Sequence, residues 1–217
     1  MRNARENMIE NQIRAGGVSS QRVFDSLDAI RRANFVPPAY REYAYADMEI
    51  PLPCSQHMLT PLTEARILEA VSVNENETVL EIGTGSGYMA ALLAHGARHV
   101  TSVEIEPVLK EMAENNLSHC NARNVHVLCE NGFAIERYAP DRLFDVIVLS
   151  GTVSSIPDIF TNHLADNGRM VYFHGTGFRT CAFLLKKTPE AGPDIRSLFD
   201  TSAKALREQA YHSRFRF

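Results

Sequence analysis

The chain has few cysteines, and no two of them are spaced as a redox or zinc motif requires. Four occur in 217 residues, at Cys54, Cys120, Cys129 and Cys181, and no pair reads C-x-x-C. Cys129 lies in an apolar run, where cysteine behaves as a small hydrophobic side chain. Scattered thiols of this kind are typical of the reducing cytoplasm, so we expect a cytoplasmic protein.

Long apolar runs and concentrated positive charge are also lacking. No window approaches the roughly 18 apolar residues of a membrane span, and the first residues, MRNARENMIENQIRAGG, lack the apolar centre of a signal peptide. The net charge is −4, and no basic stripe offers the electrostatic surface that nucleic acid requires. We therefore expect neither a membrane protein nor a nucleic-acid-binding protein.

The histidines do not form a convincing metal site. Eight are present, and His95 and His99 are close enough in sequence to share a helix face. Gly96 between them indicates the end of a helix, which would separate the two rings, and the open set of ligands that a metal needs is missing. The sequence therefore predicts no bound metal.

The motif VLEIGTGSGY, at residues 79–88, is the most informative part of the chain. Glycine permits backbone angles that a Cβ would forbid and lets a ligand approach the bare chain, which applies to Gly83, Gly85 and Gly87. A dinucleotide-binding loop has the spacing G-x-G-x-x-G, and here the third glycine comes one residue too early. A NAD-dependent oxidoreductase is therefore disfavoured. The form E-x-G-x-G-x-G resembles the glycine loop of class I S-adenosylmethionine (SAM)-dependent methyltransferases.

Apolar runs at residues 100–104, 125–129 and 144–149 continue the pattern that begins with the strand before this loop. Near-continuous apolar runs are typical of parallel strands whose two faces are both covered by helices. The run at 100–104 ends on Glu104, the position from which an acidic residue binds ribose hydroxyls in nucleotide-binding α/β folds. Glycine loop and acid occur in the expected order, so we expect them to form one site.

Further elements are expected on both sides of this region. Helical spacing or helix-start signals predict helices at 8–13, 23–30, 62–71 and near 158–164, and strands follow at 169–173, 181–185 and 195–199. We predict turns at 74–77 and 166–168, and an extended, proline-containing connection from Tyr43 to Pro53. The prediction is an α/β fold with a doubly wound, mostly parallel, seven-stranded Rossmann-like sheet. Residues 1–60 form a helical extension and substrate-side segment, and 61–217 form the SAM-binding core.

At this point the chain resembles one family, protein-L-isoaspartate O-methyltransferase, over nearly its whole length. The resemblance rests on these stretches: MIENQIRAGGVSSQRVFDSL, FVPPAYREYAYADMEIPLP, TPLTEARILEAV, VLEIGTGSGYMAALLA, SVEIEP, LSGTVSSIPDIFTNHLADNGRMVYFHG and the terminal Phe215-Arg216-Phe217. The stretches before Thr60 are the specific ones, because other SAM-dependent methyltransferases share only the glycine loop, the acid and the fourth strand.

The resemblance implies a protein-repair reaction: methyl transfer from SAM to the carboxylate of L-isoaspartyl residues in damaged proteins, which leaves S-adenosyl-L-homocysteine. A carboxylate is already nucleophilic at neutral pH, so the enzyme needs alignment of the reacting atoms rather than a general base. The residues implied for cofactor binding are Glu81, Gly83, Thr84, Gly85, Ser86, Gly87, Glu104, Ile105, Asn131, Gly132 and Ser150. Those implied for the substrate are His57, Met58, Gly151 and Thr152.

The substrate side departs from the family pattern. The family carries a serine or threonine two residues before the proline that opens the helix, and here that position is Leu59. Thr60 is the nearest hydroxyl and is the candidate catalytic residue, although threonine before Pro61 is also a good helix cap. Ser55-Gln56-His57 replaces the family's G-Q-T text. Asn131 replaces the usual aspartate, and its side-chain oxygen can still accept a hydrogen bond from adenine.

Two alternatives to isoaspartyl repair stay open. The chain could methylate a different acceptor, or bind SAM without turnover. A methyltransferase acting on nucleobase amines is disfavoured, because Ser150-Gly151-Thr152 follows the fourth strand where such enzymes carry a proline-rich motif.

Overall fold

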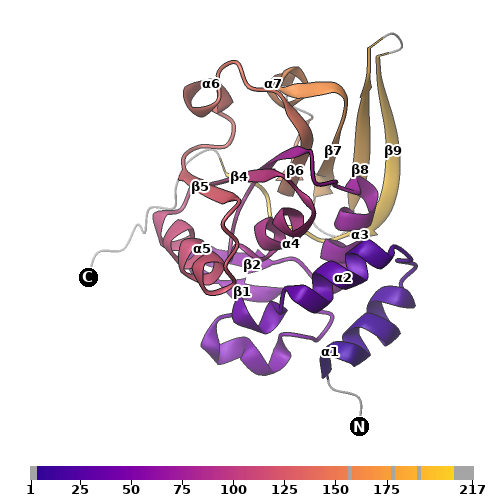
Figure 1. Ribbon diagram of the computed structural model, residues 1–217, viewed down its shortest axis with the longest axis vertical. Coiled ribbons are helices and arrows are strands. Elements are labelled where there is room, and N and C mark those ends of the chain that lie inside the picture. The colour runs from indigo at the N-terminus through magenta and orange to yellow at the C-terminus, as the bar shows by residue number, and fades with distance from the viewer. Residues whose placement is uncertain (1–3, 156–157, 177–178, 190–191, 208–217) are drawn as a thin grey trace.

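The computed structural model describes residues 4–155, 158–176, 179–189 and 192–207 (Figure 1). Its centre is a seven-stranded sheet in the order β5-β4-β3-β6-β7-β8-β9. The strands are β3 (Thr78–Ile82), β4 (His99–Glu104), β5 (Val125–Cys129), β6 (Phe144–Val153), β7 (Leu164–Thr176), β8 (Arg179–Thr188) and β9 (Gly192–Thr201). The first five strands in this order, β5 to β7, pair in parallel, whereas β8 pairs antiparallel with β7 and β9 pairs antiparallel with β8. The predicted α/β fold with a mostly parallel seven-stranded sheet is confirmed.

Side chains alternate between the two faces of this sheet and so build two apolar clusters. In β3, Val79 joins the larger cluster and the next residue, Leu80, joins the smaller one. The larger cluster is completed by α3 (Pro61–Val71), α4 (Tyr88–Gly96), α5 (Pro107–His119) and the N-terminal segments. The smaller is completed by α6 (Ile135–Tyr138) and α7 (Asp158–Asn162). In Figure 1 the sheet accordingly lies between α6 and α7 on one side and α2 to α5 on the other.

The N-terminal segments pack into the larger cluster together with α4, the helix that follows the glycine motif. They are α1 (Ala4–Asn7), the π-helical η1 (Met8–Arg14), α2 (Gln21–Ala29), and the 3₁₀ turns η2 (Arg32–Asn34) and η3 (Pro38–Tyr43). Met8, Ile13 and Leu27 are buried in one cluster with Tyr88 of α4. The predicted helices at 8–13 and 23–30 are thus found, with the first in π-helical form.

Residues 50–58 differ from the predicted connection. They form a two-stranded antiparallel ribbon, β1 (Ile50–Leu52) and β2 (Gln56–Met58), joined by the 3₁₀ turn η4 (Pro53–Ser55). The turn places Cys54 and Ser55 at φ of +57° and +58°, a region favoured by glycine. The sequence shows no glycine there and two prolines nearby, so it gives no hairpin signal. The extended connection predicted from Tyr43 to Pro53 thus leads into a two-stranded ribbon that the sequence did not indicate.

Two strand boundaries also differ from expectation. Residues 150–153, predicted to follow the fourth strand, belong to β6, whose pairing with β7 shifts register between Val148 and Thr152. The predicted turn at 166–168 lies inside β7, where pairing jumps from Leu164 to Arg169. The helix near 158–164 ends at Asn162. In both β6 and β7 the strand continues past an irregularity in its pairing, where the local sequence resembles a turn.

The remaining predicted elements are found. Helix α3 covers residues 61–71, and the strands predicted at 169–173, 181–185 and 195–199 lie within β7, β8 and β9. The terminal Phe215-Arg216-Phe217 lies outside the described residues. Among the helices that the structure describes, none is both long and apolar enough to cross a lipid bilayer.

Candidate functional site

The glycine loop joins β3 to α4 with three residues in the left-handed region of backbone space. Gly83, Gly85 and Gly87 have φ of +94°, +56° and +85°, so the predicted need for glycine is borne out by the backbone. The loop lies at the carboxyl end of the central strand, where ligands bind in open α/β sheets. Gly87 packs against α5, since a Cβ added there would lie 3.2 Å from the Cβ of Ala113. It therefore holds two helices together rather than facing a ligand.

A cavity of about 690 Å³ opens at this end of the sheet, and we refer to it as the main cavity. It brings together segments far apart in sequence: the ends of β3 and β4, the turn after β5, the register shift in β6, and strand β2. The predicted residues that line it are His57, Met58, Leu59, Gly83, Gly85, Glu104, Ile105, Gly132, Ser150 and Gly151.

Glu104 connects the glycine loop with the end of β4. Its side chain accepts a hydrogen bond of 2.8 Å from the backbone N–H of Gly85 and one of 3.0 Å from that of Glu106. Burial raises the pKa of Glu104, and these backbone hydrogen bonds act in the opposite direction. Each carboxylate oxygen has a second lone pair, so the group retains acceptor capacity toward the cavity.

A smaller cavity of about 310 Å³ continues inward past the glycine loop, and we call it the inner chamber. It shares Leu59 and Gly85 with the main cavity and adds other predicted residues, Glu81, Thr84 and Ser86. Helix α3 contributes Glu64 and helix α4 contributes Tyr88 and Met89. Both cavities therefore adjoin the glycine loop.

Glu81 is fully buried beside this chamber and is held by hydroxyl groups. The hydroxyl of Ser102 donates to Oε2 at 2.6 Å, and that of Ser150 donates to Oε1 at 3.1 Å. Burial raises the pKa of Glu81 to about 8, although the two hydroxyl hydrogen bonds lower it. The side chain is consequently largely protonated at neutral pH.

Four predicted residues line neither cavity: Thr60, Gly87, Asn131 and Thr152. Thr60 caps α3, because its hydroxyl oxygen accepts a hydrogen bond of 3.3 Å from the N–H of Thr63. Asn131 lies next to the lining residue Gly132, and its side-chain oxygen accepts a hydrogen bond of 2.9 Å from the N–H of Phe133. Of the two functions considered for Thr60, the structure thus shows the capping contact.

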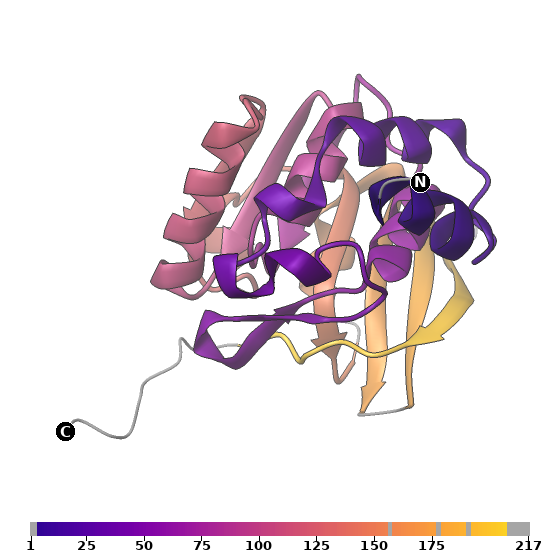
Figure 2. The same ribbon diagram turned by 90° about the horizontal axis from the view of Figure 1, so that it is seen from below.

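The segment after β9 forms a wall of the main cavity that the sequence did not reveal. Residues 204–207 line the cavity; the N–H of Thr152 donates to the carbonyl of Lys204, and the carbonyl of Thr152 accepts from the N–H of Leu206. Arg207 donates to Glu106 at 2.9 Å and to the carbonyl of Cys54 at 2.9 Å. Figure 2 shows this yellow segment running beside the β1–β2 ribbon. These are tertiary contacts between distant segments, and no local pattern marks them.

A buried arginine supports the opposite wall and was also missed. Arg32 is fully buried, forms an ion pair with Glu64, and donates a hydrogen bond of 2.7 Å to the carbonyl of Leu59. Its guanidinium lies 5.1 Å from the centre of the Tyr88 ring. Burial raises the pKa of Glu64, and the guanidinium of Arg32 opposes the shift. Buried arginines are rare unless paired, but the pairing cannot be read from a sequence.

Comparison with known proteins yields one family and consistent relatives. The family model described as Protein-L-isoaspartate(D-aspartate) O-methyltransferase matches residues 3–200. A protein-L-isoaspartate O-methyltransferase of Methanospirillum hungatei is 36% identical over 167 residues, which cover 77% of this chain and 76% of the relative. One from Koribacter versatilis is 35% identical over 196 residues, covering 90% of this chain and 86% of the relative.

Solved structures share the fold. A Plasmodium falciparum protein provisionally named protein-L-isoaspartate O-methyltransferase, in complex with S-adenosyl-L-homocysteine, superposes with a TM-score of 0.82 at 19% identity. The match covers 96% of this chain and all of that one. A second structure of that name gives a TM-score of 0.79 at 24% identity and covers 93% of this chain and 65% of the other.

Proposed function

The chain belongs to the protein-L-isoaspartate O-methyltransferase family, and from that premise we propose that it methylates L-isoaspartyl carboxylates of proteins with SAM as methyl donor. The single observation that carries the proposal is the hydrogen bond between the N–H of Gly85 and the carboxylate of Glu104. This hydrogen bond holds the glycine loop against the acidic residue at the end of β4, and both line the main cavity. These are the two features that identify a SAM site. The product would be S-adenosyl-L-homocysteine.

The residues present fit a bound SAM molecule. The positive φ of Gly83 and Gly85 leaves backbone exposed where side chains would otherwise project. Glu104 lines the main cavity and offers acceptor lone pairs suited to ribose hydroxyls. We propose that these three residues hold the cofactor, together with the lining residues Glu81, Thr84, Ser86, Ile105, Gly132 and Ser150.

The chemistry requires little of the protein beyond alignment. SAM supplies an activated methyl group on a sulfonium, and the acceptor carboxylate is itself the nucleophile. The chain's contribution is to hold carboxylate oxygen, methyl carbon and sulfur in line and to exclude water, which can lower a barrier by roughly 7–11 kcal/mol. We propose that His57 and Met58, from the segment 1–60, face the acceptor together with Gly151, from the core at residues 61–217.

One observation favours a second candidate, a methyltransferase with another acceptor. Leu59 presents an apolar side chain to both cavities, and the hydroxyl of Thr60 is engaged at the start of α3. Neither position therefore offers a hydroxyl to an acceptor carboxylate. The protein would then keep its SAM site and differ in what it methylates.

Methyl transfer from labelled SAM to an isoaspartyl peptide tests the proposal, with the normal aspartyl peptide of the same sequence as control. We expect label on the isoaspartyl peptide only. A parallel calorimetric titration with SAM separates the failures: SAM binding without label on either peptide would indicate another acceptor or binding without turnover. Loss of SAM binding as well would contradict the cofactor assignment.

A further inference from the structure

Tyr88 presents a buried hydroxyl that no described residue uses. Its side chain is 2% exposed and lines the inner chamber, and no described atom forms a hydrogen bond with its oxygen. The Nδ1 atom of His57, which lines the same chamber, is likewise buried and without a hydrogen-bond partner in this part of the chain. Buried polar atoms are nearly always paired in folded proteins. Two unpaired atoms on residues that line one chamber point to a ligand that supplies the missing partners.

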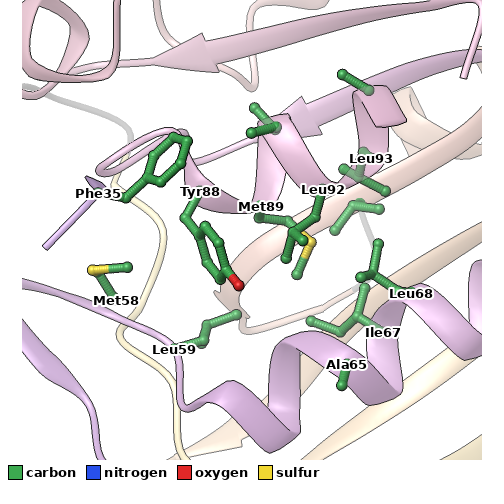
Figure 3. Packing of buried hydrophobic residues seen from close by; sticks show 14 of the residues in the cluster. Phe35, Met58, Leu59, Ala65, Ile67, Leu68, Tyr88, Met89, Leu92 and Leu93 are labelled. Atoms are coloured by element: carbon green, nitrogen blue, oxygen red, sulfur yellow. The ribbon is translucent and has the colours of Figure 1, made fainter. Parts of the chain in front are cut away.

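The Tyr88 ring is fixed in place from two sides. The ring of Phe35 lies 5.2 Å away, centre to centre, and the guanidinium of Arg32 lies 5.1 Å from the ring centre. Arg32 is itself held by Glu64 and by the carbonyl of Leu59. Figure 3 shows the phenolic oxygen directed toward Leu59 and the start of α3. The hydroxyl is therefore preorganised at the wall between the cofactor loop and the acceptor segment.

This hydroxyl is a donor across the working pH range. Burial and the neighbouring Glu64 raise the pKa of Tyr88 above its usual range, with Arg32 opposing. A protonated phenol can donate one hydrogen bond, and its natural partner is an anionic oxygen, because hydrogen bonds to charged acceptors are the stronger ones.

The charge of the chamber permits an anionic partner. Burial raises the pKa of Glu81 to about 8, so this carboxyl is largely neutral at pH 7. Glu64 is paired with the guanidinium of Arg32, so the pair carries no net negative charge. Neither acid thus excludes a carboxylate from the space beside Tyr88.

We propose that the Tyr88 hydroxyl donates a hydrogen bond to a ligand carboxylate bound in the inner chamber. This inference rests on the proposed function, which supplies two such carboxylates: that of the amino-acid end of SAM and that of the isoaspartyl acceptor. Both bring the same chemistry, an anionic oxygen that accepts a hydrogen bond. The two sources differ in which binding step they affect, and that difference can be measured.

The test is Tyr88→Phe, which removes one oxygen and keeps the ring. The matched control is Tyr172→Phe, because Tyr172 is equally buried but stacks on Phe183 within the smaller apolar cluster, on the other face of the sheet. For each variant and the wild type we would measure the thermal midpoint, the Kd for SAM by calorimetry, and kcat and KM for the isoaspartyl peptide. An unpaired hydroxyl stabilises nothing, so we expect the midpoint of Tyr88→Phe to stay the same or rise.

If the hydroxyl serves the carboxylate of SAM, the Kd for SAM should rise about tenfold or more. If it serves the acceptor, that Kd should stay constant while kcat/KM for the peptide falls about tenfold or more, with Tyr172→Phe near wild type in both cases. Binding and kinetics within twofold of wild type would overturn the inference, as would losses that only follow a lowered thermal midpoint. If wild type proved inactive on the peptide, the proposed function would fail, yet the SAM titrations of wild type and Tyr88→Phe would still decide the inference; no change there would overturn it.

Discussion

The two walls of the ligand site are built in different ways. What we call the cofactor wall, the part around Gly85 and Glu104 where we place SAM, comes from a short stretch of chain, in which the turn after β3 and the end of β4 are joined by a hydrogen bond between these two residues. What we call the acceptor wall, where we place the methyl acceptor, is assembled from segments far apart: Arg32, Leu59 and Tyr88 meet there, and residues 204–207 close the other side. Local sequence determines the first wall, whereas long-range packing determines the second.

The largest expected effect falls on the cofactor wall. In Gly85→Val a branched side chain must adopt φ near +56° at the position where we place the cofactor. We expect the affinity for SAM to fall about a thousandfold or more, measured by calorimetry. Gly17→Val is the matched control, since Gly17 also has a positive φ, of +94°, but a Cβ there would meet nothing within 4 Å. Unchanged affinity in Gly85→Val would remove the loop from the site.

A pH dependence of stability tests the burial of Glu81. Its pKa is about 8 in the folded state and about 4.3 when exposed, so the folded protein holds a proton that the unfolded chain releases in between. The proton bound to folded Glu81 contributes its full share to the free energy of unfolding below about pH 4, and this share is lost as the pH rises to about 8. We expect wild type to lose on the order of 3 kcal/mol between pH 5 and 8 that Glu81→Gln does not lose.

Urea unfolding at pH 5, 6.5 and 8 measures this difference. Other titrating groups, Glu64 included, are common to both proteins and cancel in the comparison. Parallel stability curves for wild type and Glu81→Gln would show that Glu81 titrates normally in the fold.

Removal of the Glu104 carboxylate should have the next largest effect. Glu104→Ala loses hydrogen bonds from ribose hydroxyls to a charged acceptor, worth about 1.5–3 kcal/mol, so we expect the Kd for SAM to rise about 10- to 150-fold. Glu114→Ala, on helix α5, where the side chain is about half exposed and pairs with Lys110, serves as control. Should Glu104→Ala bind within twofold of wild type while remaining folded, Glu104 does not contact the cofactor.

The smallest effect is expected next to the acceptor wall, at Thr60, which caps α3 and lines neither cavity. Since its oxygen accepts the N–H of Thr63, Thr60→Ala should lower the free energy of unfolding by about 0.5–2 kcal/mol and leave the rate per folded molecule nearly intact. Urea melts and initial rates at saturating SAM provide both quantities. A rate loss of tenfold or more in protein that is still fully folded would assign Thr60 to catalysis. The acceptor side would then also depend on a residue that the local sequence identifies.

What the sequence predicts well follows the same division. The strands of the parallel sheet, the positive φ of the loop glycines and the cavity position of Glu104 all follow from local pattern and spacing. The β1–β2 ribbon was missed because Cys54 and Ser55 adopt left-handed angles without glycine. Arg32 reads as a surface charge in sequence, and only the placement of Glu64 and the Leu59 carbonyl makes its burial possible. Such pairings depend on the completed fold and leave no local signal.

The segment from Ser202 to Arg207 bears on the order in which parts of the protein fold. It is tethered at Glu49, Thr152 and Glu106, and all three anchors lie in parts of the chain translated earlier. The segment can bond to these anchors only after they have come together in the fold, so the sheet can pair before this wall of the ligand site is in place. Competence to bind would be acquired in a late, separate step, after the bulk of the folding is done.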